Sequence, residues 1–407
     1  MTLQRARVRN IARVSAGVLA LVITLVAMIA ADVRRAPVAT ASVAPRTLDE
    51  PWTWDLPTGV PRPVVPTDNP MSVAKFELGR RLFYDRGMSG NGTFSCASCH
   101  LQSRAFADNL PRAIGSTGQL HPRGAMSLAN IAYASVLTWA NPNESRLEHQ
   151  ALTPMFGEVP VEMGLAGLEA PLLARLRSDT SYTSLFRRSF PERAEPVTLE
   201  TLTKALATFE RGLVSFNSPY DRAKLRHDRA AMLPSAQRGE QLFFSERTEC
   251  FHCHGGLILS GSVNYQGKGT PDIEYHNNGL YAVGPQHEYP ADNPGLAEFT
   301  HRRKDNGAFK APTLRNVGVT APYMHDGSLR TLEDVVAHYA RGGRLISGGP
   351  NAGDGRTNPN RSPFVRGFRL SERERRDLVA FLHALTDSTF LRDARYADPA
   401  ASSRSSK

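Results

Sequence analysis

Apolar residues recur at helical spacing in several parts of the chain, whereas strand-like alternation is sparse. One predicted helix face carries Leu202, Leu206, Phe209 and Leu213. Another helix is predicted to begin at Ser371, which pairs with Glu374 in a capping box ahead of an apolar stripe. Thr331 and Asp334 make a similar start for a helix that runs through Tyr339. These patterns predict an all-α fold.

A degenerate repeat divides the body of the chain. Segment 77–83 reads Glu-Leu-Gly-Arg-Arg-Leu-Phe, and segment 238–243 reads Arg-Gly-Glu-Gln-Leu-Phe. Each segment precedes a pair of cysteines, and the two pairs are about a domain's length apart. We therefore expect two helical domains, residues 67–230 and 231–395, which join near residues 220–235.

The N-terminus has the features of an export segment. Residues 1–31 carry arginines at positions 5, 7, 9 and 13, followed by an uncharged apolar run, residues 14–31, which predicts a signal peptide or a membrane anchor. The arginine bias indicates that the body lies outside the cytoplasm, in the periplasm. Residues 32–66 are rich in proline and are expected to form an extended spacer.

Two internal stretches and the C-terminus lack a periodic pattern. Residues 255–300 and 342–365 are rich in glycine, proline and asparagine, so we expect long loops there. Residues 396–407 end in a run of serine and basic residues and are expected to form a disordered tail.

Composition is compatible with a globular body and argues against nucleic acid as a partner. Hydrophobic residues make up 41% of the 407 residues, enough for a sizeable core. The formal net charge is +10, but four of these charges lie in residues 1–31. No basic stripe interleaved with aromatic residues is present.

The cysteines carry the strongest chemical signal. All four belong to two Cys-x-x-Cys-His motifs, Cys96-Ala-Ser-Cys99-His100 and Cys250-Phe-His-Cys253-His254. In such motifs the thiols form thioethers with the vinyl groups of haem, and the histidine ligates the iron from the proximal side. A zinc site is the alternative, but two such motifs behind an export segment favour two covalent haem c groups. Spacing alone does not choose the distal ligands.

A longer segment adds a resemblance. Residues 309–327 read Phe-Lys-Ala-Pro-Thr-Leu-Arg-Asn-Val-Gly-Val-Thr-Ala-Pro-Tyr-Met-His-Asp-Gly, followed by the helix from Thr331 to Tyr339. Together they resemble the bacterial dihaem cytochrome c peroxidase and MauG superfamily, over roughly residues 67–390. The resemblance implies two cytochrome c-like domains, each with one haem.

One stretch narrows this resemblance further. It contains Gly115-Ser-Thr-Gly118, His121-Pro-Arg-Gly124, Met126-Ser-Leu-Ala-Asn130 and Leu137-Thr-Trp-Ala-Asn141. The stretch looks closest to MbnH-type enzymes, which are MauG relatives that oxidise tryptophan in a partner protein, MbnP.

The resemblance also suggests a sixth ligand for the second haem iron. Peroxidases of the superfamily carry a methionine fourteen residues past the position of His325, whereas this chain and MauG carry a tyrosine there, Tyr339. A thioether favours ferrous iron, but a phenolate is hard and anionic and favours higher oxidation states. Met324 and His338 are the competing ligands.

At the first haem, the resemblance places a glutamate over the iron. Gln150, Pro154 and Met163 match the surrounding motif and select Glu162, although a longer loop leaves Glu158 as an alternative. A carboxylate in a mostly apolar pocket can move a proton between the two oxygens of hydrogen peroxide.

Other matching positions suggest further roles. Trp139 matches a tryptophan that lies between the two haems. Hard oxygen ligands for Ca²⁺ are expected from Asn130, Thr320 and Pro322.

Three residues near these sites have less definite roles. Arg315 and His325 are expected to contact haem propionates or the water between the haems. Many peroxidases of the family have a histidine near the position of His121 that caps the first haem until reduction, so His121 stays unassigned.

The favoured interpretation is a peroxide-dependent dihaem oxidase that acts on a protein partner. The first alternative is a cytochrome c peroxidase that takes electrons from a small cytochrome, and Tyr339 counts against it. A non-enzymatic electron carrier is the third class, and it would require both irons to be six-coordinate.

Overall fold

The computed structural model of the chain describes residues 47–400. The predicted export segment, its apolar run 14–31 and the last residues of the tail lie outside the described residues. In the described part of the chain, no helix is both long and apolar enough to span a bilayer.

The all-α expectation is wrong. Helical residues, α and 3-10 together, make up only about 36% of the described chain. Two small antiparallel sheets are also present, in which β1 (Tyr275–His276) pairs with β2 (Phe309–Lys310), and β3 (Leu345–Ile346) pairs with β4 (Gly353–Asp354). Three of these strands lie in the segments that we predicted as loops, because glycine, proline and asparagine prevent helices there while short extended pieces still pair across the chain.

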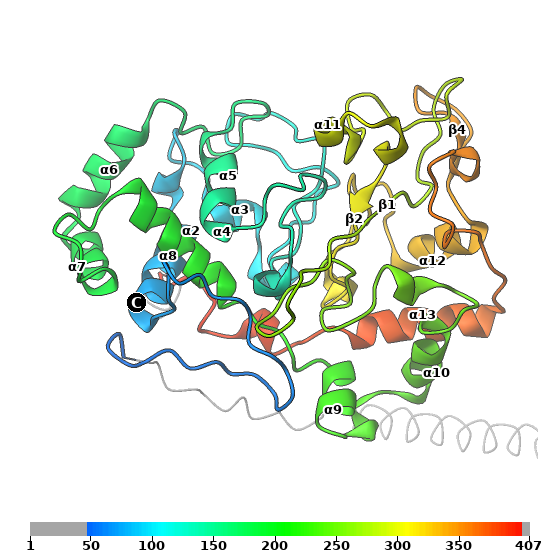
Figure 1. Cartoon of the computed structure of the whole chain (residues 1–407), viewed down its shortest axis with the longest axis horizontal. Helices are drawn as coiled ribbons and strands as arrows, with labels where there is room; N and C mark the ends of the chain where they lie inside the picture. Colours follow the sequence, from blue (N-terminus) through cyan, green and yellow to red (C-terminus); the bar gives the residue numbers. More distant parts are fainter. Residues whose placement is uncertain (1–46, 401–407) are drawn as a thin grey trace, which may run out of the picture. The chain divides into compact units, whose positions relative to one another are not determined.

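Helices lie at both ends of the described part of the structure in Figure 1. The α-helices are α2 (Val73–Tyr84), α3 (Cys96–Cys99), α4 (Leu147–Gln150), α5 (Leu152–Phe156), α6 (Glu169–Ser178), α7 (Thr180–Ser189), α8 (Leu199–Arg211), α9 (Pro219–Leu225), α10 (Pro234–Phe243), α11 (Ala297–Thr300), α12 (Leu332–Arg341) and α13 (Glu372–Ala384). The 3-10 turns are η1 (Arg86–Met88), η2 (Gln102–Arg104), η3 (Ile131–Tyr133), η4 (Arg229–Ala231), η5 (Cys250–His252), η6 (Arg303–Asp305), η7 (Val317–Val319), η8 (Gly355–Thr357) and η9 (Phe390–Arg392).

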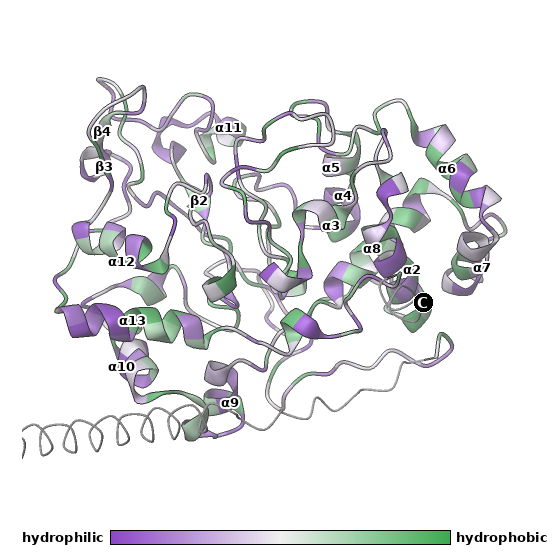
Figure 2. Cartoon of the chain, turned by 180° about the vertical axis from the view of Figure 1, so that it is seen from behind, coloured by the Kyte–Doolittle hydropathy of each residue, from purple (hydrophilic) through white to green (hydrophobic). Residues whose placement is uncertain are grey.

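The predicted helix starts are confirmed. Thr331 caps α12 through the backbone of Asp334, and Ser371 caps α13 through the backbone of Glu374. Of the predicted apolar stripe, Leu202, Leu206 and Phe209 lie on α8 and Leu213 follows its end, and all four are buried; α8 itself is buried on every side from Thr201 to Arg211. In Figure 2, α13 is hydrophilic over its first turns and hydrophobic toward its end, where it enters the core.

The degenerate repeat marks two equivalent helix crossings. Gly79 lies where α2 crosses α8, and a Cβ atom there would come within 1.9 Å of the Ala205 carbonyl oxygen. Gly239 lies where α10 crosses α13, and a Cβ atom there would come within 1.9 Å of the Asp377 carbonyl oxygen. Each half therefore uses a glycine to bring two helices into backbone contact ahead of its cysteine motif.

Each crossing belongs to its own hydrophobic core. The first core is built mainly from residues 76–213, and the second from residues 232–385. Phe390 and Tyr396 follow α13 yet pack into the first core, so the chain returns to its first half at the end. The described residues belong to one compact unit, and the domain boundary near residues 220–235 stays a prediction.

The described part of the predicted spacer lies against this body. The ring of Trp52 is centred 5.2 Å from that of Phe76 in the first core. The Pro61 carbonyl accepts a hydrogen bond from the Tyr133 hydroxyl at 2.8 Å.

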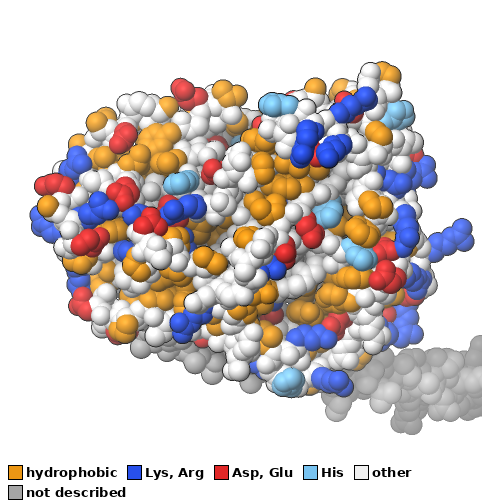
Figure 3. All heavy atoms as spheres, viewed as in Figure 1, with side chains coloured by type: hydrophobic (Ala, Val, Ile, Leu, Met, Phe, Trp, Pro, Cys, Tyr) orange, Lys and Arg blue, Asp and Glu red, His pale blue; other side chains and the backbone are white. Residues whose placement is uncertain are grey.

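On the face of the molecule seen in Figure 3, lysine and arginine side chains are interspersed with acidic side chains.

Replacement of Gly239 by alanine should destabilise the protein, because the added methyl group would overlap the α13 backbone. Overpacking of this kind costs about 1–3 kcal/mol of unfolding free energy. Denaturant unfolding should show a lower midpoint for Gly239→Ala, whereas Gln241→Ala, at an exposed position of the same helix, should leave the midpoint within error. An unchanged midpoint for Gly239→Ala would contradict the close crossing.

Candidate functional site

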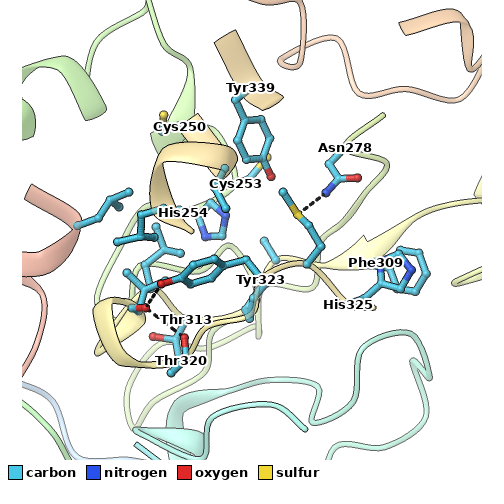
Figure 4. Close-up of a pocket in the computed structure, with 18 of the residues that line it drawn as sticks. Cys250, Cys253, His254, Asn278, Phe309, Thr313, Thr320, Tyr323, His325 and Tyr339 are labelled. Atoms are coloured by element: carbon cyan, nitrogen blue, oxygen red, sulfur yellow. Dashed lines mark hydrogen bonds between the residues drawn. The ribbon is translucent and has the colours of Figure 1, made fainter. Parts of the chain in front are cut away.

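The second cysteine motif borders a cavity of about 220 Å³. Cys250, Cys253 and His254 line it from the segment around η5, and Tyr339 lines it from α12 (Figure 4). Much of the remaining wall is apolar and includes Val336, Phe368, Leu378 and Leu382. The cavity therefore combines the two thiols and the imidazole that a covalently bound haem requires with a phenol, in a largely apolar wall.

His254 is oriented for ligation. Its Nδ1–H donates a hydrogen bond to the Leu259 carbonyl at 3.3 Å, so the other ring nitrogen, Nε2, carries the free lone pair. Burial lowers the pKa of His254 to about 4. The imidazole is therefore neutral at physiological pH, as an iron ligand must be.

Two of the three candidate ligands on the distal side line the same cavity. These are the Tyr339 hydroxyl and the Met324 thioether. His338 does not line the cavity among the described residues, and its Nε2–H donates to the Asn278 carbonyl at 3.0 Å. The geometry therefore disfavours His338 and leaves Tyr339 and Met324 as candidates.

The first cysteine motif forms the short helix α3. His100 follows it, and its Nδ1–H donates to the Phe106 carbonyl at 2.7 Å. This is the same arrangement as at His254, since both imidazoles are tied to a backbone carbonyl a few residues later. Phe83 and Phe106 are fully buried beside it. Burial lowers the pKa of His100, so this imidazole is neutral as well.

The two candidate glutamates, Glu158 and Glu162, lie on the loop that follows α5, and they differ in exposure. Glu158 is exposed at the turn, next to Val159, which is 96% exposed. Glu162 is partly buried, with 33% of its side chain exposed, and burial raises its pKa. Burial is the main cause of the raised pKa of Cys96 and Cys99. Smaller contributions come from the charges of Glu210 at Cys96 and Asp108 at Cys99, and the charge of Glu162 adds to both.

Residue His121 also reaches this loop. Its Nε2 lies 3.8 Å from Glu162 Oε1, and its Nδ1 contacts the backbone of Arg123. Burial lowers the pKa of His121, so its ring is mostly neutral at pH 7. The structure thus brings Glu162 and the unassigned His121 together. Gln150 ends α4 and is partly buried.

Trp139 lies in the wall of the cavity, toward the first half of the chain. Its indole N–H donates to the Gly124 carbonyl at 2.9 Å, and its ring meets that of His325 edge-on with centroids 6.5 Å apart. His325 is buried and stacks on Phe309 at 3.8 Å. Trp139 and His325 therefore form one packed aromatic group at the edge of the second site.

The residues expected to bind Ca²⁺ have different environments. Asn130 is buried, and its amide exchanges two hydrogen bonds with the backbone of Ser215 at 2.8 and 2.9 Å. Its oxygen keeps one further lone pair. Thr320 and Pro322 line the cavity.

Most of the hydrogen bonds of the Arg315 guanidinium are made to other residues of the same chain. Its guanidinium forms a buried ion pair with Asp221 at 2.6 Å, and it donates to the Leu257 carbonyl at 2.7 Å. A contact with a haem propionate stays a prediction.

Comparison with known proteins gives these motifs a family. Residues 73–230 match the model of the di-haem cytochrome c peroxidase family. The methylamine utilization protein MauG of Methylorubrum extorquens is 35% identical over 81% of this chain and 82% of its own length. The cytochrome c551 peroxidase of Pseudomonas aeruginosa is 28% identical over 78% of this chain and 80% of its own length. The chain belongs to the di-haem cytochrome c peroxidase and MauG family.

A solved structure agrees with this assignment. A MauG-like protein associated with microbial copper homeostasis is 47% identical, with a TM-score of 0.83, over 86% of this chain and 99% of its own. As a member of the family, the chain is a di-haem oxidoreductase of the peroxidase type. The two motifs, each with a neutral and oriented imidazole, fit two haems.

Three polar residues at the cavity were not anticipated. Asp108 is buried with one carboxylate oxygen that has no hydrogen-bond partner, and burial raises its pKa to about 6. Lys310 is buried with its ammonium group on the Val136 carbonyl, and burial lowers its pKa to about 7. Asn278 contacts Met324. No spacing rule selects such residues, because their neighbours come from distant segments.

The thiols at both motifs predict covalent attachment of both haems. Denatured protein should give a pyridine haemochrome corresponding to about two haems per chain, and acid acetone should not extract them. The variant Cys250→Ala/Cys253→Ala should retain only one covalent haem. Extractable haem in the unmodified protein would exclude thioether bonds.

Proposed function

We propose that this protein is a MauG-type enzyme that uses hydrogen peroxide to oxidise a protein partner. The export segment predicted from residues 1–31 supports a periplasmic location. Within the family, relatives named MauG and relatives named peroxidase both match about four-fifths of the chain. The choice between the two activities therefore depends on the chain's own residues.

The observation that carries the proposal is the position of the Tyr339 oxygen. It faces the same cavity as His254 and the two thiols. A phenolate oxygen is a hard anionic ligand that stabilises ferric and more oxidised iron. Such a ligand suits a site that stores oxidising equivalents, and it does not suit a site that only relays electrons.

Glu162 is the proposed acid–base group at the first site. Its carboxylate would take a proton from the peroxide oxygen nearer the iron and return it to the outer oxygen, which leaves as water. The haem iron bound through His100 would supply the electrons for cleavage of the O–O bond. Partial burial keeps the carboxylate basic enough for this transfer, because its pKa is raised.

Trp139 is the proposed connection between the sites. Its indole packs on His325 and lines the cavity of the second site. An aromatic group in this place can pass an electron from one site to the other.

We also infer that Ca²⁺ binds Asn130, Thr320 and Pro322. Removal of Ca²⁺ by a chelator should then lower activity.

We further propose which kind of protein is oxidised. The solved relative associated with copper homeostasis supports an MbnH-like role, in which tryptophan of an MbnP-like protein is oxidised. Mass spectrometry of such a protein, after incubation with enzyme and peroxide, should show oxidised tryptophan. The cytochrome c peroxidase alternative predicts rapid oxidation of a small cytochrome and no change in the partner's mass.

Replacement of Tyr339 by methionine should alter only one haem. The oxidised protein should contain one high-spin and one low-spin ferric haem, which low-temperature EPR resolves. Tyr339→Met should change the low-spin signal, because a thioether replaces the oxygen ligand, and should leave the high-spin signal intact. A low-spin signal that does not respond would make Met324 the ligand.

The reaction with peroxide should depend on pH through Glu162. The carboxylate is the active form, so the rate should rise as pH rises through the Glu162 pKa, which burial places above its usual value. Glu162→Gln should slow stopped-flow formation of the oxidised protein by on the order of 10²–10⁴ and remove this dependence. Glu158→Gln, at the exposed neighbour, should react normally; equal effects of both substitutions would contradict the assignment.

A further inference from the structure

Asn278 contacts one of the two candidate distal ligands and lies near the other. Its Nδ2–H donates a hydrogen bond to the sulfur of Met324 at 3.2 Å, which Figure 4 draws as a dashed line. Asn278 also opposes the rise that burial causes in the pKa of Tyr339, so its amide is close to the phenol. All three residues line the cavity. One amide is therefore bonded to the Met324 sulfur and lies near the Tyr339 oxygen, the two atoms that could bind the second iron.

The orientation of this amide is determined by its neighbours. The Leu280 backbone N–H donates to the Tyr289 hydroxyl oxygen at 3.0 Å, and the Tyr289 hydroxyl donates to Asn278 Oδ1 at 2.8 Å. Since the thioether sulfur of Met324 can only accept, the group that faces it must be the amide nitrogen, and the amide oxygen then accepts from the Tyr289 hydroxyl. The amide nitrogen has two hydrogens, one of which is directed to Met324.

The backbone of Asn278 is held as well. Its carbonyl accepts the hydrogen bond from His338 Nε2, and His338 directly precedes Tyr339 on α12. Tyr289 and His338 are both buried, so water competes little for these bonds. The helix that carries Tyr339 therefore also anchors Asn278.

We propose that Asn278 is a positioning residue that selects the Tyr339 oxygen over the Met324 sulfur as the sixth ligand of the second haem. The proposal rests on the function proposed above. An N–H donor forms a charge-assisted bond with an anionic oxygen, about twice as strong as a neutral one, whereas a thioether sulfur is only a weak acceptor. The same donor therefore favours tyrosinate ligation and holds the sulfur of Met324 aside.

Removal of the donor tests this proposal without reliance on activity. Asn278→Leu keeps the size of the side chain but cannot donate, so the ratio of tyrosine- to methionine-ligated haem should fall by about 10- to 100-fold. EPR and the optical spectrum should show a second low-spin species, and potentiometry should show a higher reduction potential for this haem. Asn278→Leu/Met324→Leu should return to one species. Asn360→Leu, the same change at a site that does not line the cavity, should match the unmodified protein.

A milder variant covers the case in which Asn278→Leu does not fold. Tyr289→Phe removes the hydroxyl that orients the amide, and it should produce a smaller change of the same sign. Unaltered low-spin signals and potentials in both variants would overturn the role of Asn278. Failure of the proposed function gives a different result, because the low-spin signal would then not respond to Tyr339→Met.

Discussion

The account depends on a phenol oxygen that is buried in a largely apolar cavity. Burial raises the pKa of Tyr339, so the protein alone would keep this oxygen protonated and neutral. A ferric iron at the same place would supply the positive charge that makes the anion stable. The cavity, the neutral imidazole of His254 and the donor Asn278 are all explained if the Tyr339 oxygen binds iron. Without iron, the arrangement would only bury polar groups at a cost.

The remainder of the fold brings this oxygen and the proposed peroxide site into one compact unit. Gly79 and Gly239 permit the same close helix crossing in each half, and each crossing precedes a cysteine motif. The irregular segments, which make the fold less helical than expected, supply most of the distinctive chemistry. Glu162 and Trp139 lie on such segments, as do Asn278 and Met324. Helices thus provide the scaffold together with Tyr339 and the first cysteine motif, and loops provide these other groups.

Features that depend on residues close together in the sequence, such as helix caps and apolar helix faces, could be predicted from the sequence. The caps at Thr331 and Ser371 depend on residues three positions away, and the pattern of α8 depends on one helix face, so all three were confirmed. The two-residue strands were missed because each depends on a distant partner. The same limit hid Asn278, whose contact with Met324 and position near Tyr339 arise only when three separate segments fold together.

The central claim is that an oxygen ligand at the second haem lets both haems share the oxidising equivalents of one peroxide. Mössbauer spectroscopy of ⁵⁷Fe-labelled protein tests it most directly, after one equivalent of peroxide is added to the fully ferric form without prior reduction. The account predicts that both iron sites change and that the oxidised form is long-lived. If neither site reacts until one haem has been reduced, the protein is a cytochrome c peroxidase, and His121 becomes the candidate for the ligand that reduction displaces.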